Sequence, residues 1–332
     1  MKDSSEHKAL LSVISPCYNE SKVIGLFYTE LKQVLESLED LGHEIIFVDD
    51  GSTDGTLAQL NQMAQENPCV RVCSLSRNFG HQIALTAGLD LAEGEAVVMM
   101  DCDLQHPPDL IPEMVKKWRQ GYDVVSAVRN ETEGAPWFKN ITSKSFYFLL
   151  NSLSNIHIPQ GAADFCLLSR RVCKVLQKMP ERHRFLRGMI SWVGFNRTFI
   201  SYQAPRRAGG KSKYTFIKML SLATEAILSF SSTPLRLATR VGVIVTLSGF
   251  IYFIWILLKL KQAVPGWASL IGVTLILGGC QLIFIGLIGQ YLARIFEEVK
   301  GRPRYIIKQT PVTSQQSDDK QKSGNNTPAA ES

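Results

Sequence analysis

Residues 97–110 read VVMMDCDLQHPPDL, so four apolar residues lead directly into Asp101 and Asp103 with only Cys102 between them. Two carboxylates this close repel each other, and they do not both stay charged in a buried place unless a cation lies beside them. A strand that ends in a solvated turn is the alternative, because Asp is a common turn residue. The surrounding sequence has to decide between a turn and a cation site.

The first 130 residues alternate apolar runs with segments of helical periodicity. The apolar runs are 9–16, 44–51, 70–76, 95–103 and 123–129, and the helical patterns are 21–41, 56–67, 82–94 and 109–121. Strands that are apolar along their whole length and alternate with helices indicate an α/β fold with a mainly parallel sheet covered on both faces. Ligands of such sheets bind outside the carboxyl ends of the strands. The segments at these ends are PCYNE, DDGSTDG, SRN, DCDLQ and Arg129.

Composition and cysteine usage favour a reduced, cytosol-facing protein. The chain has 332 residues, a formal net charge of +6 and 45% apolar residues that are unevenly distributed. The first ten residues, MKDSSEHKAL, contain no signal-peptide core, so we expect an N-terminus that is not exported. Seven cysteines without a C-x-x-C pair favour a reduced protein without a zinc site.

Two uncharged stretches, 241–258 and 267–293, predict a membrane hairpin. At about 1.5 Å per residue the first covers about 27 Å as a helix, close to a hydrocarbon layer of roughly 30 Å. We expect spans at about 241–260 and 267–293, with two buried core helices as the alternative. Arg and Lys residues are concentrated outside the two ends of the pair, which predicts that both ends are cytoplasmic.

The segments on either side of the hairpin have different compositions. Residues 135–235 read as helices and loops, and the stretches near 140–155 and 214–232 mix Lys with aromatic and aliphatic residues, as helices at a membrane surface do. Docking of these helices on the core is the alternative. The tail is polar and predicted to be disordered from about 312. The expected organisation is a catalytic domain at 1–210, interface helices at 211–236, the hairpin within 237–293 and a cytoplasmic tail at 294–332.

The acidic strand ends need cations or hydrogen-bond donors. The sequence contains neither G-x-G-x-x-G nor G-x-x-x-x-G-K-[ST], which argues against a dinucleotide fold and a P-loop. The carboxylates of Asp101 and Asp103 and the amide oxygen of Gln105 are hard ligands that suit Mg²⁺ or Mn²⁺, usually together with phosphate oxygens of a substrate. The sequence therefore predicts a site that binds a diphosphate.

Five motifs resemble, in the right order, those of family 2 glycosyltransferases of the dolichol-phosphate-mannose synthase type. They are VISPCYNE, VDDGSTDGT, SRNFGHQ, MDCDLQHPPDL and RRAGGKSKY. The resemblance runs from about residue 10 to 305 and is closest to bacterial polyprenyl-phosphate glycosyltransferases with a C-terminal membrane hairpin. It implies a GT-A-type nucleotide-sugar-binding catalytic domain on the cytoplasmic side of a bacterial inner membrane. It also implies inverting transfer of a sugar from a nucleotide-sugar, such as UDP-glucose, to undecaprenyl or dolichyl phosphate.

The resemblance also implies roles for matching residues. Nucleotide-sugar binding would involve Pro16, Tyr18, Glu20, Val48, Asp50, Asp101, Cys102, Asp103 and Arg129. The ligands of Mg²⁺ or Mn²⁺ would be Asp101, Asp103 and Gln105. The catalytic set would be Asp101, Asp103, Arg129, Asp164, Arg207 and Lys213, in which the basic side chains neutralise phosphates and Asp164 touches the sugar or the acceptor.

Several of the residues near the strand ends also fit structural roles. Tyr18 suits a core aromatic residue and Glu20 suits the cap of the following helix. Asp49 is expected to accept hydrogen bonds within the turn that it begins. His81, at a predicted helix start, fits a cap or packing residue.

The later basic and acidic residues have alternatives too. Arg207 and Lys213 suit charges at a membrane surface as well as ligands of phosphate. Asp164 fits a structural ion pair with Arg170 or Arg171 as well as contact with a substrate. No carboxylate outside the metal site is expected to be indispensable as a base, because a phosphate monoester with a second pKa near 6 is mostly dianionic at neutral pH.

Two other functions compete with polyprenyl-phosphate glycosylation. A processive polysaccharide synthase would need a Q-x-x-R-W motif and usually more membrane spans, and the sequence lacks both. A non-catalytic membrane scaffold would be expected to have damaged metal ligands, and Asp101 and Asp103 are intact. The sequence suggests no nucleic-acid partner and leaves a homo-oligomer open.

Overall fold

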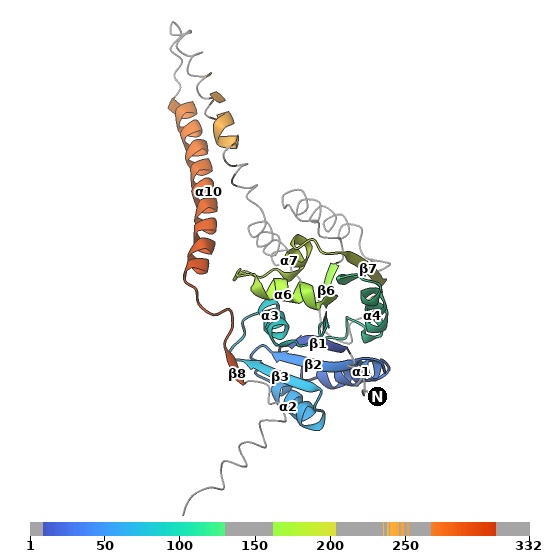
Figure 1. Cartoon of the computed structure of the whole chain (residues 1–332). Coiled ribbons are helices and arrows are strands. Elements are labelled where there is room, and N and C mark those ends of the chain that lie inside the picture. The colour runs from blue at the N-terminus through green and yellow to red at the C-terminus, as the bar shows by residue number, and fades with distance from the viewer. Residues whose placement is uncertain are drawn as a thin grey trace, which may run out of the picture. The chain divides into compact units, whose positions relative to one another are not determined.

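The computed structural model describes residues 9–129, 162–203 and 267–309, with single positions and short runs between 235 and 251 (Figure 1). These residues belong to two compact units, which are described separately. The sheet unit draws its residues from Met1–Lys144, Ile158–Lys213 and Pro303–Ser332, and the helical unit from Ser145–His157 and Tyr214–Arg302. The predicted interface helices near 140–155 and 214–232 lie outside the described residues.

A mainly parallel sheet forms the centre of the sheet unit, as predicted. Its described strands follow the order β7-β5-β6-β4-β1-β2-β3-β8. They are β1 (Leu10–Cys17), β2 (Gly42–Asp49), β3 (Val70–Leu75), β4 (Ala96–Met99), β5 (Val124–Arg129), β6 (Ala162–Ser169), β7 (Arg197–Tyr202) and β8 (Ile307–Gln309). Strand β6 runs antiparallel to β4 and β5, and β8 runs antiparallel to β3, whereas the other pairs are parallel.

Helices cover both faces of this sheet. They are α1 (Ile24–Glu36), α2 (Thr56–Glu66), α3 (His81–Leu91), α4 (Ile111–Arg119) with the short η1 (Pro108–Leu110) before it, α6 (Arg170–Lys178) and α7 (Leu186–Trp192). Neighbouring strand residues point to opposite faces. Val13 belongs to the core that α1, α2 and α4 share, whereas Ile14 lies against Gly88 of α3 on the other face. Both faces are therefore closed to solvent, which is why these strands read as continuous apolar runs.

Two strands lie inside the segment that the sequence predicted as helices and loops. Strand β6 is apolar from Phe165 to Leu168 and buried, but a run of basic residues follows it directly. Strand β7 buries only alternate residues, Ile200 and Tyr202. The prediction over 135–235 was wrong for these two segments, because a short alternating strand carries a weak periodic signal.

The predicted cytoplasmic tail contains a further strand of the sheet. Strand β8 pairs with the edge strand β3, with Ile307 opposite Leu75. Just before it, the carbonyl of Ile306 accepts a hydrogen bond from the amide of Ser76 (2.8 Å). The chain that follows residue 302 thus returns to the sheet and covers an edge that would otherwise be open.

The helical unit contains the long helix α10 (Trp267–Val299), which includes the predicted second span at 267–293. Its 33 residues correspond to a length of about 50 Å. Among the described residues, only Leu277–Val299 within this helix is long and apolar enough to cross a membrane, with a mean hydropathy of 1.4 and no buried residue in its apolar window. Most of the predicted first span, 241–260, lies outside the described residues.

Candidate active site

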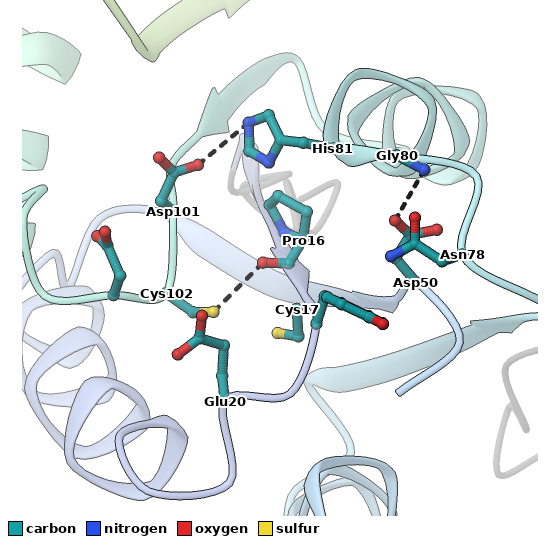
Figure 2. A pocket seen from close by; sticks show the side chains of 11 residues that line it. Pro16, Cys17, Glu20, Asp50, Asn78, Gly80, His81, Asp101 and Cys102 are labelled. Atoms are coloured by element: carbon teal, nitrogen blue, oxygen red, sulfur yellow. Dashed lines mark hydrogen bonds and ion pairs between the residues drawn. The ribbon is translucent and has the colours of Figure 1, made fainter. Parts of the chain in front are cut away.

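A pocket of about 380 Å³ opens at the carboxyl ends of β1 to β4, where the sequence predicted a ligand site (Figure 2). The residues that line it are Pro16, Cys17, Tyr18, Glu20, Asp50, Asn78, Gly80, His81, Asp101, Cys102 and Asp103. They include every residue that was predicted to bind the nucleotide-sugar except Val48 and Arg129. Segments that are far apart in the sequence therefore meet here because parallel strands end at one edge.

The segment after β1 contributes side chains that are not needed for packing. Tyr18 is 46% exposed, so it is not a core aromatic residue. Helix α1 has no side-chain cap, so Glu20 does not cap it. Asn19 adopts a positive φ of 56°, and its side-chain carbonyl accepts the amide of Thr53 (2.9 Å). This bond ties the segment after β1 to the one after β2.

The two aspartates at the end of β2 have different partners. Asp49 is buried and accepts hydrogen bonds from the amide of Ser52 (3.1 Å) and the hydroxyl of Ser74 (2.9 Å), which is the structural role expected for it. Asp50 accepts the two backbone amides at positions 79 and 80 (2.7 and 2.9 Å). Burial raises the pKa of Asp50 although these amides oppose the change. Each of its oxygens keeps a second lone pair for a ligand.

The DCDLQ segment forms a tight loop with strained backbone. Leu104 adopts a φ of 62°, which is rare for residues with a side chain and occurs mainly at functional sites. Asp103 accepts hydrogen bonds from the backbone amide of Gln105 (3.0 Å) and from its side-chain amide (2.7 Å). The thiol of Cys102 donates to the carbonyl of Pro16 (3.3 Å). The loop is thus closed on itself and anchored to β1.

Asp101 has a buried carboxylate oxygen without a hydrogen-bond partner. This atom is Oδ1, and Nε2 of His81 lies 3.3 Å from it without making a hydrogen bond. The backbone amide of Asp101 donates to Nδ1 of His106 (2.9 Å), whose buried ring stacks on Phe165 at 5.1 Å. An unsatisfied buried carboxylate oxygen is costly, and a cation would satisfy it.

The donor set at this loop suits a divalent cation that arrives with a phosphate ligand. Within the part of the chain that is described, no three His, Cys, Asp or Glu side chains form a metal site by themselves. Asp101 and Asp103 nevertheless supply two carboxylates, and Mg²⁺ is usually held by one or two carboxylates together with substrate phosphates. Gln105, the third predicted ligand, is bonded to Asp103 through its amide nitrogen. This bond leaves the amide oxygen of Gln105 available, so the assignment of Asp101, Asp103 and Gln105 as ligands stays a prediction.

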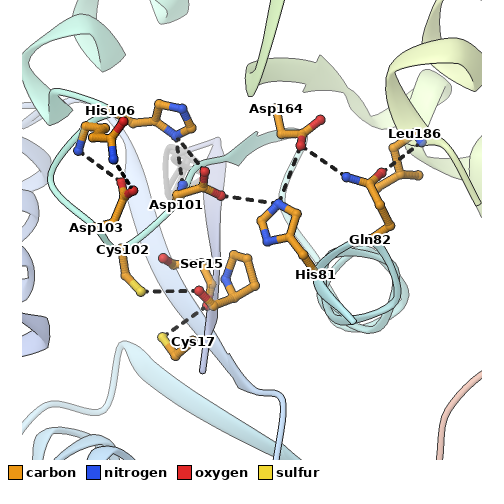
Figure 3. A network of polar contacts seen from close by, with 12 residues as sticks. Ser15, Cys17, His81, Gln82, Asp101, Cys102, Asp103, His106, Asp164 and Leu186 are labelled. Atoms are coloured by element: carbon orange, nitrogen blue, oxygen red, sulfur yellow. Dashed lines mark hydrogen bonds and ion pairs between the residues drawn. The ribbon is translucent and has the colours of Figure 1, made fainter. Parts of the chain in front are cut away.

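Asp164 of β6 lies beside the pocket in a dense polar network (Figure 3). It accepts two hydrogen bonds from Arg187 (2.6 and 2.9 Å) and one from the side chain of Gln82 (3.0 Å), and Nε2 of His81 is 3.5 Å away. Burial alone would raise the pKa of Asp164, but the charge of Arg187 and the contact with His81 hold this pKa well below its usual range. Asp164 is therefore a paired, ionised carboxylate.

The ion-pair partner of Asp164 is Arg187 and not Arg170 or Arg171. The guanidinium of Arg171 instead donates to Asp123, and that of Arg170 donates to a backbone carbonyl. The reason is geometric: α6 begins directly after β6, so its first residues lie at the opposite end of that strand from Asp164. The structural ion pair that the sequence left open for Asp164 is present, but its partner is Arg187 and not one of the two arginines that were predicted.

Of the predicted site residues that the structure describes, four do not line the pocket: Val48, Gln105, Arg129 and Asp164. Val48 is fully buried in the core. Arg129 ends β5 in an exposed position, opposite Tyr202 of β7. Arg207 and Lys213 lie outside the described residues. The assignment of phosphate-binding roles to the three basic residues stays a prediction.

The pocket and the polar network beside it also contain residues that were not predicted as site residues: Cys17, Asn78, Gly80, His81, Gln82, His106 and Arg187. Gln82 and His106 stand inside the motifs SRNFGHQ and MDCDLQHPPDL, so a closer look at those motifs could have found them. Arg187 lies 23 residues from Asp164, and the only signal for it is the basic run RHRFLR at 182–187.

Comparison with known proteins identifies the family. Residues 12–176 match the model of glycosyl transferase family 2, and residues 233–295 match that of the GtrB C-terminal hairpin. A Bacillus subtilis relative named uncharacterized glycosyltransferase YkcC is 43% identical over 90% of this chain and 93% of its own. An Escherichia coli relative named prophage bactoprenol glucosyl transferase homolog is 40% identical over 90% of this chain and 98% of its own.

Among solved structures, glucosyl-3-phosphoglycerate synthase from Mycobacterium tuberculosis, in complex with Mn²⁺, UDP-glucose and phosphoglyceric acid, is 16% identical. The match covers 66% of this chain and 78% of that one, with a TM-score of 0.43. The family assignment and the observed sheet agree on a GT-A-like α/β fold, and they favour an enzyme over a non-catalytic scaffold. The chain therefore belongs to the family 2 glycosyltransferases that carry a GtrB C-terminal hairpin.

Proposed function

We propose that this glycosyltransferase moves a sugar from a UDP-sugar, such as UDP-glucose, to a polyprenyl phosphate, such as undecaprenyl or dolichyl phosphate. The observation that carries the proposal is the acidic pocket at the ends of β1 to β4, in a chain whose relatives are named bactoprenol glucosyl transferase at 40% identity over 90% of its length. The products would be a polyprenyl-phosphate sugar and UDP.

The pocket supports binding of the nucleotide part of the donor on its β1 and β2 side. Tyr18 presents an exposed aromatic ring that could stack on a base, and Asp50 offers carboxylate oxygens to a ribose or base donor. Pro16 and Glu20 complete that side of the pocket. The preference for uridine rests on the likeness to bacterial family members.

Asp101 and Asp103 would hold Mg²⁺ or Mn²⁺ between them and the donor diphosphate. When bound, such an ion supplies positive charge where negative charge develops on the departing diphosphate. The orphaned oxygen of Asp101 supports this assignment, because it is a buried acceptor that still needs a partner. Arg129, Arg207 and Lys213 are proposed to neutralise the donor and acceptor phosphates.

The acceptor would act as the nucleophile without a general base. A phosphate monoester is mostly dianionic at neutral pH, so its oxygen carries a free electron pair. This oxygen forms a bond to the anomeric carbon while the bond to the diphosphate oxygen breaks, and the electron pair leaves with UDP. No proton moves, and a single displacement converts an α-linked donor into a β-linked product. Asp164 is poorly suited to act as a base, because Arg187 and Gln82 already occupy its oxygens.

The lipid acceptor would explain the membrane hairpin. A prenyl tail stays in the bilayer, so the enzyme has to meet the phosphate at the membrane surface. The match to the GtrB C-terminal hairpin and the apolar stretch in α10 support attachment to a membrane. We propose two spans, at about 241–260 and 267–293, with the catalytic domain and both termini in the cytoplasm and interface helices near the acceptor phosphate.

The test is a transfer assay with the full chain in membranes that contain undecaprenyl phosphate. Radiolabelled UDP-sugars are supplied one at a time, and labelled lipid is expected with at least one of them, UDP-glucose first. The double variant Asp101→Ala, Asp103→Ala and added chelator should each remove the labelled lipid, whereas Asp109→Ala, an exposed aspartate outside the pocket, should not. Undiminished transfer by the double variant in the presence of chelator would refute the proposal.

A further inference from the structure

His81 begins α3 and points into the pocket between two carboxylates (Figures 2 and 3). Its Nε2 atom lies 3.3 Å from Oδ1 of Asp101 and 3.5 Å from Oδ2 of Asp164. A ring nitrogen carries one N–H at most, so the two carboxylates lie near a single donor, and Oδ1 of Asp101 makes no hydrogen bond with it. No role in substrate binding or metal ligation has been assigned to this histidine above.

The two carboxylates depend on His81 to different degrees. Asp164 is held by Arg187 and by Gln82, so its position does not rely on the imidazole. Gln82 is itself fixed, because its side-chain carbonyl accepts the amide of Leu186 (3.0 Å). The carboxylate of Asp101 has no such support from a donor.

The second histidine near Asp101 cannot supply that support. Nδ1 of His106 lies 3.7 Å from Oδ2 of Asp101, but it already accepts the backbone amide of Asp101 and so carries no proton of its own. His106 fixes the backbone of the loop and leaves the direction of the carboxylate open. Among the described side-chain contacts of that carboxylate, only the one with His81 brings a ring N–H close to it.

The structural roles that the sequence left open for His81 do not fit the geometry. The N-cap of α3 is Gly80, the helix has no side-chain cap, and Asp50 binds the amide of Gly80 (2.9 Å). The His81 side chain is 41% exposed, so it is not a packing residue of the core. The carboxylate of Asp50 thus orients the turn from which the imidazole reaches into the pocket.

We propose that His81 is a positioning residue that aims the Asp101 carboxylate at the divalent-cation site and then releases it. Without a cation, Nε2 of His81 lies between the two carboxylates, 3.3 Å from Oδ1 of Asp101 and 3.5 Å from Oδ2 of Asp164, and keeps the Asp101 carboxylate turned toward the pocket. When Oδ1 of Asp101 takes the cation, the N–H on Nε2 stays with Asp164, which Arg187 and Gln82 keep in place. The exchange needs no change in protonation. This inference rests on the metal site of the proposed function and adds a residue that prepares it.

The experiment measures cation binding directly, with the full chain in lipid nanodiscs and saturating UDP. Mn²⁺ is titrated, and free Mn²⁺ is followed by electron paramagnetic resonance. His81→Ala should raise the Mn²⁺ dissociation constant about tenfold or more, as loss of an outer-shell partner does. His81→Gln places an amide nitrogen where Nε2 was, so its Mn²⁺ dissociation constant should stay within about threefold of that of the native chain. The amide nitrogen of His81→Asn reaches only the position of Nδ1, so this variant should bind Mn²⁺ as weakly as His81→Ala. His43→Gln, near the start of β2, is the matched control and should bind as the native chain does.

The other possible results would refute either the positioning role of His81 or the metal site. Native affinity in His81→Ala would refute the role of His81, and so would equal weakening in His81→Gln and His81→Ala, since the donor then has no effect. If His81→Ala does not fold, equal affinities of the Gln and Asn variants would refute it. Asp101→Asn distinguishes failure of the metal site from failure of the positioning role. Unchanged Mn²⁺ binding in Asp101→Asn would refute the metal site itself. Lost Mn²⁺ binding in Asp101→Asn together with native affinity in His81→Ala would refute only the positioning role of His81.

Discussion

Asp101 and Asp164 face the same imidazole, yet their surroundings prepare them for opposite tasks. Asp164 is paired with Arg187 and accepts a hydrogen bond from Gln82, and its pKa lies well below the usual range because the charge of Arg187 and the contact with His81 outweigh its burial. Asp101 keeps an oxygen without a hydrogen bond. One carboxylate is therefore already satisfied by the protein, and the other still requires a ligand.

Asp164→Asn should reduce turnover without abolishing it. The amide keeps an acceptor for His81 but leaves Arg187 without its counter-ion, so we expect kcat to fall about tenfold to a hundredfold. Steady-state kinetics with both substrates measure this, with Asp101→Asn as the comparison that should lose more. Near-complete loss of kcat with unchanged KM for donor and acceptor would instead identify Asp164 as a base.

Gly51 allows the turn after β2 to pack against the segment after β3. It has a φ of +69°, and an added Cβ would lie 2.5 Å from the backbone carbon of Arg77. We expect Gly51→Ala to destabilise the fold by about 2–4 kcal/mol and to weaken UDP binding, because the clash pushes on the segment that carries Asn78. Thermal unfolding with and without UDP measures both effects.

Gly25 is the matched control for that substitution. It lies in α1 with negative φ, and nothing is within 4 Å of an added Cβ. Gly25→Ala should therefore leave UDP binding unchanged and stabilise the fold by up to about 1 kcal/mol. Equal melting temperatures for the two variants would contradict the close approach at Gly51.

The acids of the site could be predicted from the sequence, and their partners could not. Asp101 and Asp103 follow a fully apolar strand, and that pattern is local. The pairing of Asp164 with Arg187 depends on where α7 begins relative to β6, which only the tertiary fold determines. Local patterns thus reveal which residues are chemically unusual, and the fold decides what they contact.

At the scale of elements, the strands that are buried on both faces were predictable and the partly covered ones were not. Strands β1 to β5 are apolar along their length because helices cover both sides of the sheet. Strand β7 buries alternate residues, and β8 has only three residues, so both fall below a recognisable pattern. The apolar run of the antiparallel strand β6 extends only from Phe165 to Leu168 and basic residues follow it, so it too gave a weak pattern.

Strand β8 should contribute measurably to the donor site. It pairs with the end of β3, and the next segment of the chain carries Asn78 of the pocket. The guanidinium of Arg304 and the hydroxyl of Tyr305 further attach it, to the carbonyl of Met179 and to Asp90. A chain that stops after residue 302 should therefore unfold at a lower temperature, by several degrees, and bind UDP more weakly.

The control for this truncation is a chain that stops after residue 309. It keeps every contact of β8 that the described residues show, so its melting temperature and UDP affinity should match those of the full chain. If stopping after 302 has no larger effect than stopping after 309, β8 is not part of the stable sheet.

At the scale of the whole molecule, the hairpin is proposed to bring the enzyme to a lipid substrate and not to perform chemistry. Replacing 237–302 with a Gly/Ser linker removes the hairpin while keeping β8, which a simple C-terminal deletion would also remove. We expect transfer to undecaprenyl phosphate in membranes to fall far more than transfer to a short, soluble prenyl phosphate. Both rates are measured with the same donor, and equal losses would contradict this role.

Because β8 lies near the end of the chain, the sheet can be completed only late in synthesis of the protein. A ribosome makes β3 more than two hundred residues before its partner, and the GtrB-type hairpin at 233–295 emerges in between. The nascent chain therefore holds an unpaired strand edge, a hazard for aggregation, until translation is almost finished. Completion of the sheet therefore requires that the hairpin segment has already been synthesised, and a chain whose translation stops before residue 307 would be left with an incomplete sheet edge next to the pocket.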